Sequence, residues 1–189
     1  MAKPIKFAHV LFMTRRFDEM VFWYQNVFEA TAVHRDPVVA FLTYDDENHR
    51  FGFANLDVLR PQPIDSAGIG ESGVNHLSYT YANVGDLLGV YGRLRDQGIA
   101  PYWSVHHGMT LSLYYQDPDG NRIELQVDCF DSEGAIAYMR SEEFASNPIG
   151  IDYDPESLLE RLRAGASNEE LLRRPDGPMS EIPAAHGVT

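Results

Sequence analysis

The chain has 189 residues, and 28 Asp and Glu against 15 Lys and Arg give it a formal net charge of −13. Such a charge repels nucleic acid phosphates and anionic lipid, so we expect neither as a partner. Hydrophobic residues make up 44% of the chain, which is enough for a packed core. A single cysteine, Cys129, excludes an internal disulfide framework. Because no apolar run is long enough for a bilayer span or signal peptide, we expect a cytoplasmic protein.

An internal repeat organises the first two thirds of the sequence. HVLFMTRRFDEMVFWY begins at His9, and HLSYTYANVGDLLGVY begins at His76. In each copy a histidine opens a short strand-like stretch, and four apolar residues then recur at helical spacing. They are Phe17, Met20, Val21 and Tyr24 in the first copy, and Val84, Leu87, Leu88 and Tyr91 in the second. Each copy therefore predicts a strand followed by an amphipathic helix.

Three further strand-like stretches follow each helix. They are ATAVHR, VVAFLTY and HRFGFANL in the first copy, and IAPYW, MTLSLYY and NRIELQV in the second. We expect turns at His106–Gly108 and at Asp117–Gly120, where Pro fixes φ and Gly accepts positive φ. The sequence thus predicts an α+β fold of two βαβββ modules, about 5–57 and 74–128, within one domain over 1–130.

The remaining residues, 131–189, read as a tail of short helices. Asp154 and Pro155 are typical of the N-cap and first position of a helix. The stretch from Ser167 to Glu170 has the form of a capping box. From Pro175 onward we expect a loose chain end. Helices of this kind pack on the domain or on a second copy, and we expect a homo-oligomer.

Two histidines and one glutamate are the candidate metal ligands. His9 and His76 hold equivalent places in the two copies, and Glu124 lies on the polar face of the strand after the second turn. Two His and one carboxylate make the facial triad of non-haem Fe(II) enzymes, which leaves positions open for a substrate and a gas. Taken singly, each residue also fits a structural, hydrogen-bonded role. Gly52 stands opposite Glu124 in the repeat, so we expect no fourth protein ligand.

These stretches resemble the vicinal oxygen chelate superfamily, which includes glyoxalases, bleomycin resistance proteins and dioxygenases. AHVLFMT, NHLSYTY and HHGMTLSLYYQDPDGNRIELQVD carry the resemblance, which covers residues 5–130. Within the superfamily, the chain is most similar to short, single-domain type I extradiol catechol dioxygenases. The resemblance implies paired modules that form a half-barrel around a divalent metal. It also implies an enzyme of aromatic compound catabolism that opens the ring of a catechol-type diol and incorporates both atoms of O2.

The resemblance further implies roles for individual residues. His9, His76 and Glu124 match the iron ligands, with Fe(II) expected and Mn(II) allowed by the ligand types. A substrate oxygen would be held by Tyr114 and by His107, although the spacing leaves the choice between His106 and His107 open. His49 matches an acid–base histidine beside the bound oxygen. No argument from the sequence assigns a function to His34 or His186.

Three other functions fit the same fold. A fosfomycin-resistance-type transferase needs cationic residues for a phosphonate, and the sequence places no Lys or Arg cluster near the site. A glyoxalase-type isomerase would favour a fourth ligand at Gly52. A metal-free binding module would not need His9, His76 and Glu124 together. The dioxygenase is therefore the favoured hypothesis.

Overall fold

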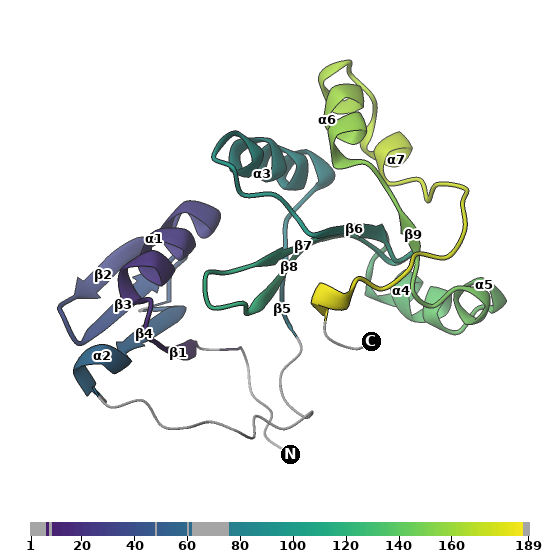
Figure 1. Ribbon diagram of the computed structural model, residues 1–189. Coiled ribbons are helices and arrows are strands. Elements are labelled where there is room, and N and C mark those ends of the chain that lie inside the picture. Colours follow the sequence, from purple (N-terminus) through teal and green to yellow (C-terminus); the bar gives the residue numbers. More distant parts are fainter. Residues whose placement is uncertain (1–6, 8, 48, 60, 62–75, 187–189) are drawn as a thin grey trace. The chain divides into compact units, whose positions relative to one another are not determined.

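A computed structural model describes residues 7, 9–47, 49–59, 61 and 76–186 (Figure 1). The chain divides into two compact units, each built on one mixed β-sheet. Unit 1 is Met1–Gly73 with Asp117–Gly120, and unit 2 is Val74–Gln116 with Asn121–Thr189. Among the described helices, none has the length and apolar character needed to cross a bilayer.

Unit 1 contains a four-stranded sheet and one long helix. Its elements are β1 (Val10–Thr14), α1 (Phe17–Phe28), β2 (Thr31–Arg35), β3 (Val39–Thr43), β4 (Phe51–Asn55) and α2 (Leu56–Leu59). The strand order is β1-β4-β3-β2, with β1 parallel to β4 and the other pairs antiparallel. Helix α1 buries the apolar face that the spacing predicts. The hydroxyl of Tyr24 on this face donates to the carboxylate of Asp117 over 3.1 Å.

Unit 2 repeats this order and adds the tail. Its repeat elements are β5 (His76–Thr80), α3 (Val84–Asp96), β6 (Trp103–His106), β7 (Thr110–Gln116) and β8 (Arg122–Asp128). The tail contains α4 (Ser132–Met139), α5 (Glu142–Ser146), β9 (Ile151–Asp152), α6 (Pro155–Arg163), α7 (Asn168–Leu171) and the 3-10 turn η1 (Ala184–His186). The strand order is β5-β8-β7-β6-β9. Both units therefore confirm the predicted α+β fold with two βαβββ modules.

Strand β6 begins later than predicted. The sequence predicts a strand at IAPYW, but its first residue, Ile99, bonds back to the end of α3 instead of pairing in the sheet. Gly98 has a φ of 77°, and the amide of Ile99 donates to the carbonyl of Leu94 over 2.9 Å. Pro101 has no N–H for a strand ladder. The strand therefore runs from Trp103 to His106, and His106 is part of it rather than of the expected turn.

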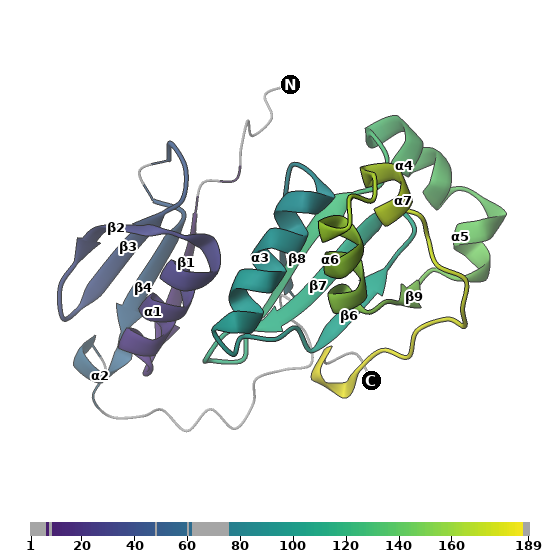
Figure 2. The ribbon, with the colours of Figure 1, turned by 90° about the horizontal axis from the view of Figure 1, so that it is seen from above.

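The tail packs on unit 2 along its length. The capping interactions predicted at Asp154 and Ser167 are both present, and they start α6 and α7. Figure 2 shows α3 and α6 side by side over one face of the sheet, where the Tyr91 hydroxyl donates to the carboxylate of Glu156 over 3.1 Å. The prediction of a loose end from Pro175 is wrong, because Ser180 and His186 are both buried.

We expect Glu156→Gln to weaken the packing of α6 on α3 at neutral pH but not at strongly acidic pH. Hydrogen bonds from Arg95 and Tyr91 hold the pKa of Glu156 below its ordinary value of 4.5. A carboxylate with a pKa lowered by folding adds stability above its unfolded pKa and loses it as pH falls through its folded pKa. Thermal melts of the variant and the wild type should therefore differ at pH 7 and converge in acid. Glu160→Gln, on the exposed side of the same helix, is the control; a difference that persists in acid would contradict the prediction.

Candidate active site

Glu124 lies at the centre of the candidate site in unit 2. It is on β8, the strand between β5 and β7, and its register partners are Ser78 and Tyr114. Alternation along β8 turns Ile123 and Leu125 into the core and puts Glu124 on the opposite face. The Glu124 side chain is nevertheless only 5% exposed. The site therefore holds a carboxylate that is largely removed from water.

The hydrogen bonds around Glu124 keep this carboxylate charged. Burial would raise its pKa, but hydrogen bonds with His76, Ser112, Ser78 and Tyr114 outweigh burial and lower the pKa to about 2. A metal-binding carboxylate must be deprotonated. Glu124 is therefore ionised at neutral pH.

His76 and Glu124 fit two neighbouring ligands of one metal ion. The Nε2 atom of His76 lies 3.3 Å from Oε2 of Glu124. Two ligand atoms about 2.1 Å from one ion, and about a right angle apart, are separated by about 3 Å. Imidazole nitrogen and carboxylate oxygen are also the donors that Fe(II) and related divalent ions accept. The donor types and their spacing therefore both fit a metal.

Tyr114 and His107 continue the hydrogen-bond network beyond His76 and Glu124. The Tyr114 hydroxyl donates to Oε1 of Glu124 over 2.9 Å, and Nε2 of His107 lies 3.0 Å from the same hydroxyl. On the other side of the ring, Nδ1 of His107 lies 2.5 Å from the carbonyl oxygen of Ile149. A carbonyl only accepts, so Nδ1 carries a hydrogen.

The protonation of this network follows from burial. Burial lowers the pKa of His107, which favours a neutral ring with a lone pair on Nε2. Burial, together with the charge of Glu124, raises the pKa of Tyr114 well above its usual value. The single hydroxyl proton of Tyr114 therefore lies between two acceptors, His107 and Glu124.

His106 faces a different part of unit 2. Its Nε2 atom lies 2.9 Å from the carbonyl of Leu172, and its Nδ1 atom accepts the amide hydrogen of Gly108 over 3.0 Å. Of the two histidines left open by the sequence, His107 is the one beside Tyr114.

His9 and His49 lie together in unit 1, directly before β1 and close to the start of β4. Their rings stack with centroids 4.4 Å apart, and the ring of Phe41 lies 4.8 Å from that of His49. Burial, followed by the charge of His9, lowers the pKa of His49. Within each unit, the described residues contain no group of three His, Cys, Asp or Glu side chains that would hold an ion. The place of His9 in the ligand set therefore stays a prediction.

Unit 1 has no acid equivalent to Glu124. Leu11 and Gly52 are register partners in its sheet, as Ser78 and Glu124 are in the other. A Cβ atom on Gly52 would lie 2.6 Å from Cδ1 of Leu11. A larger side chain at this position would require Leu11 to move, so the repeat supplies one carboxylate rather than two.

The structure places His186, to which the sequence assigns no function, beside the candidate site. Its ring centroid lies 5.6 Å from that of His76 and 5.0 Å from that of Tyr114. Only the long-range packing of the tail brings it there, so no local sequence pattern could have revealed it.

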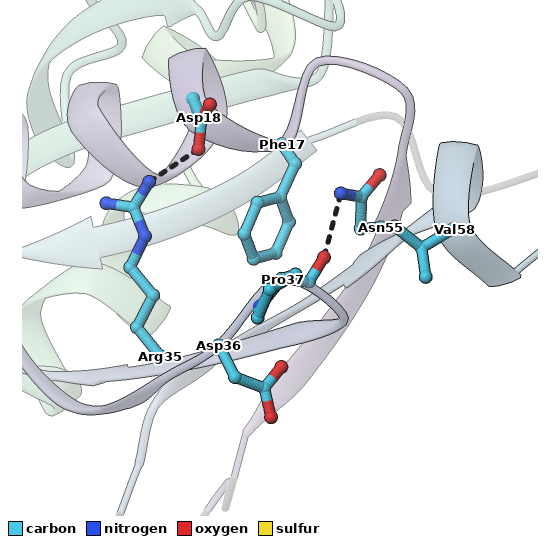
Figure 3. Close-up of a pocket in the computed structure, with 7 residues that line it drawn as sticks. All are labelled: Phe17, Asp18, Arg35, Asp36, Pro37, Asn55 and Val58. Carbon is cyan, nitrogen blue, oxygen red and sulfur yellow. Dashed lines mark hydrogen bonds and ion pairs between the residues drawn. The ribbon is translucent and has the colours of Figure 1, made fainter.

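A hollow in unit 1 is a poorer candidate. Figure 3 shows it between the start of α1 and the end of β2, where Arg35 bonds to Asp18 over 2.5 Å. The amide of Asn55 is likewise occupied by the carbonyl of Pro37 over 2.9 Å. The opposite charges already pair, and none of the predicted site residues lines the hollow.

Comparison with known proteins agrees with the fold. Residues 6–125 match the family model of the glyoxalase/bleomycin resistance protein/dioxygenase superfamily. The chain belongs to this superfamily. The lactoylglutathione lyase of Agrobacterium tumefaciens has the same fold, with a TM-score of 0.52, 16% identity, and coverage of 67% of this chain and 96% of the other.

Two proteins of Rhodococcus globerulus are more similar in sequence. Biphenyl-2,3-diol 1,2-dioxygenase 2 is 41% identical over 161 residues, which are 85% of this chain and 83% of that protein. Biphenyl-2,3-diol 1,2-dioxygenase 3 is 37% identical over an alignment of 175 residues that covers 89% of this chain and 88% of that protein. A 1,2-cleavage of a 2,3-diol breaks a ring bond beside the diol, so both relatives are extradiol dioxygenases. They confirm the predicted class.

We expect Tyr114→Phe to lower the free energy of unfolding of the metal-free protein by about 1–3 kcal/mol, because a buried acceptor on Glu124 loses its donor. Tyr115→Phe is the matched control on the same strand. The Tyr115 hydroxyl is buried with no hydrogen-bond partner among the described residues, so its loss should be neutral or slightly stabilising. Urea titrations of both variants measure the difference. Equal effects would show that the Tyr114 bonds contribute no stability.

Proposed function

We propose that this protein is an Fe(II)-dependent extradiol dioxygenase that opens the ring of an aromatic 1,2-diol with O2. One observation carries the proposal: a buried, charged Glu124 lies against His76 in a chain that is 41% identical to a biphenyl-2,3-diol 1,2-dioxygenase. We further propose that the substrate belongs to the same class, a catechol with an aryl substituent.

In this proposal His9, His76 and Glu124 hold the iron. His76 and Glu124 provide adjacent donors, and repeat symmetry adds His9 as the counterpart of His76. When bound, Fe(II) supplies a centre at which the diol and O2 meet. Three protein ligands leave the remaining positions for them.

The other residues of the network bind and orient the diol. The Tyr114 hydroxyl is a neutral donor that bonds to Glu124 in the metal-free protein, and in this proposal its hydrogen turns to a diol oxygen when the diol binds. His107 fixes the direction of that hydroxyl, because the Ile149 carbonyl fixes the hydrogen on Nδ1. His49 is proposed to move protons at the reacting oxygen. Its pKa, lowered by burial, keeps it neutral and ready to accept a proton near neutral pH.

The test is to load the protein with Fe(II) without oxygen, add 2,3-dihydroxybiphenyl, and then admit air. We expect a yellow ring-opened product and uptake of one O2 per diol. Catechol tests whether the aryl substituent is needed. Tight binding of the diol without O2 uptake would overturn the dioxygenase and favour a binding module.

Glu124→Ala is expected to abolish iron retention while the chain stays folded. The variant removes one of the three proposed ligands, and iron analysis after desalting measures the loss. Glu160→Ala, an exposed glutamate on α6, should retain iron as the wild type does. Stoichiometric iron in Glu124→Ala would remove this residue from the ligand set.

His49→Ala is expected to keep iron and diol binding but to slow turnover about 10²-fold or more, because an acid–base histidine contributes about that factor. The control is His34→Ala on the exposed strand β2 of the same unit. Steady-state O2 uptake gives kcat, and anaerobic diol titration gives the binding constant. Unchanged kcat in the His49 variant would exclude it from the reaction.

A further inference from the structure

The end of the tail is fixed to the face of the sheet that carries Glu124. Trp103 Nε1 donates to Ser180 Oγ over 2.9 Å and to Asp152 Oδ1 over 3.0 Å, and the amide of Ser180 donates to the carbonyl of Gly150 over 2.9 Å. The Ser180 hydroxyl also bonds to Asp152. Ile182 then packs against the buried cluster of Trp103, Val105 and Tyr114. Residues 180–182 are therefore held on β6 and β9.

Gln116 at the end of β7 and Arg122 at the start of β8 are register partners, and both contact the tail at Ala185. Arg122 Nε donates to the carbonyl of Ala185 over 2.6 Å, and Gln116 Nε2 lies 3.4 Å from the same oxygen. Arg122 is the register partner of both Gln116 and His76. Clamping Ala185 above this row therefore brings the following residue, His186, next to His76.

The His186 side chain is held among rings of the candidate site. Its Nδ1 atom lies 3.0 Å from the Tyr102 hydroxyl, and its ring centroid lies 5.0 Å from that of Trp103. The residue is only 8% exposed. An imidazole ring held among aromatic rings forms a flat wall, which suits the face or edge of another aromatic ring.

We propose that residues 180–186 form one wall of the diol site and that His186 contacts the bound aromatic diol. The inference rests on the proposed function and extends it, because it assigns a substrate-contacting role to a residue outside the βαβββ repeat. His186 is a specificity-determining residue here, whereas Tyr102 is a positioning residue that acts through the Nδ1 atom of His186.

The test measures diol binding without turnover. The iron-loaded full-length protein is titrated anaerobically with 4-nitrocatechol, whose absorption changes when it ionises on binding, and iron content and thermal midpoint are recorded. We expect His186→Ala to raise the dissociation constant about five- to tenfold, the effect of losing one aromatic contact. Iron content and thermal midpoint should match the wild type. Tyr102→Phe should raise the dissociation constant less, because the ring stays but its anchor is lost.

Met179→Ala is the control, since this side chain is in the same segment but is 53% exposed. A dissociation constant within twofold of the wild type in His186→Ala would overturn the inference. Loss of iron in that variant would also overturn it, because His186 would then support His76 rather than the diol. If His186→Ala does not fold, Tyr102→Phe decides, and an unchanged constant there overturns the inference.

The wild type separates the two proposals. If it binds 4-nitrocatechol and consumes O2 with 2,3-dihydroxybiphenyl while both variants bind normally, only the role of His186 fails. If the wild type neither binds nor cleaves a diol, the proposed function itself fails.

Discussion

The charged carboxylate of Glu124 in the buried face of unit 2 is the interaction on which the candidate site depends. An ionised carboxylate away from water is costly unless donors surround it. Here those donors come from both neighbouring strands, His76 and Ser78 on β5, and Ser112 and Tyr114 on β7. They reach Glu124 only while β5, β8 and β7 keep their register. The pairing of these three strands is therefore also what keeps the buried Glu124 carboxylate ionised.

The two copies of the repeat share the same strand pairing but carry different side chains at equivalent positions. The pair Ser78 and Glu124 is polar, whereas the equivalent pair, Leu11 and Gly52, is apolar and closely packed. The repeat keeps a histidine at the head of each copy, His9 and His76, but places the acid in one copy alone. In the proposed function, this asymmetry gives three protein ligands rather than four and leaves positions open for a diol and O2.

How much the sequence predicts depends on whether a signal is local. Helix faces and caps are local, and α1, α3, α6 and α7 form as their apolar spacing and capping residues predict. The predicted start of β6 is wrong because the amide of Ile99 bonds back to Leu94 in α3, a contact that strand-like residues do not encode. Glu124 was singled out by its place after a turn. His186 was not, because its position depends on hydrogen bonds to residues more than sixty positions earlier.

Two consecutive histidines connect the tail to the site. His107 Nδ1 lies against the carbonyl of Ile149, and His106 Nε2 lies against that of Leu172, so both ends of the intervening tail are anchored at the end of β6. The family model stops at residue 125, and the lactoylglutathione lyase covers 67% of this chain. The two Rhodococcus dioxygenases cover 85% and 89%, which is impossible without part of 131–189. Part of the tail is therefore aligned with these relatives and lies beyond the residues that the family model matches. Strands β5, β7 and β8 bring His76, Tyr114 and Glu124 together, whereas the tail adds the contact that fixes His107 beside the hydroxyl of Tyr114.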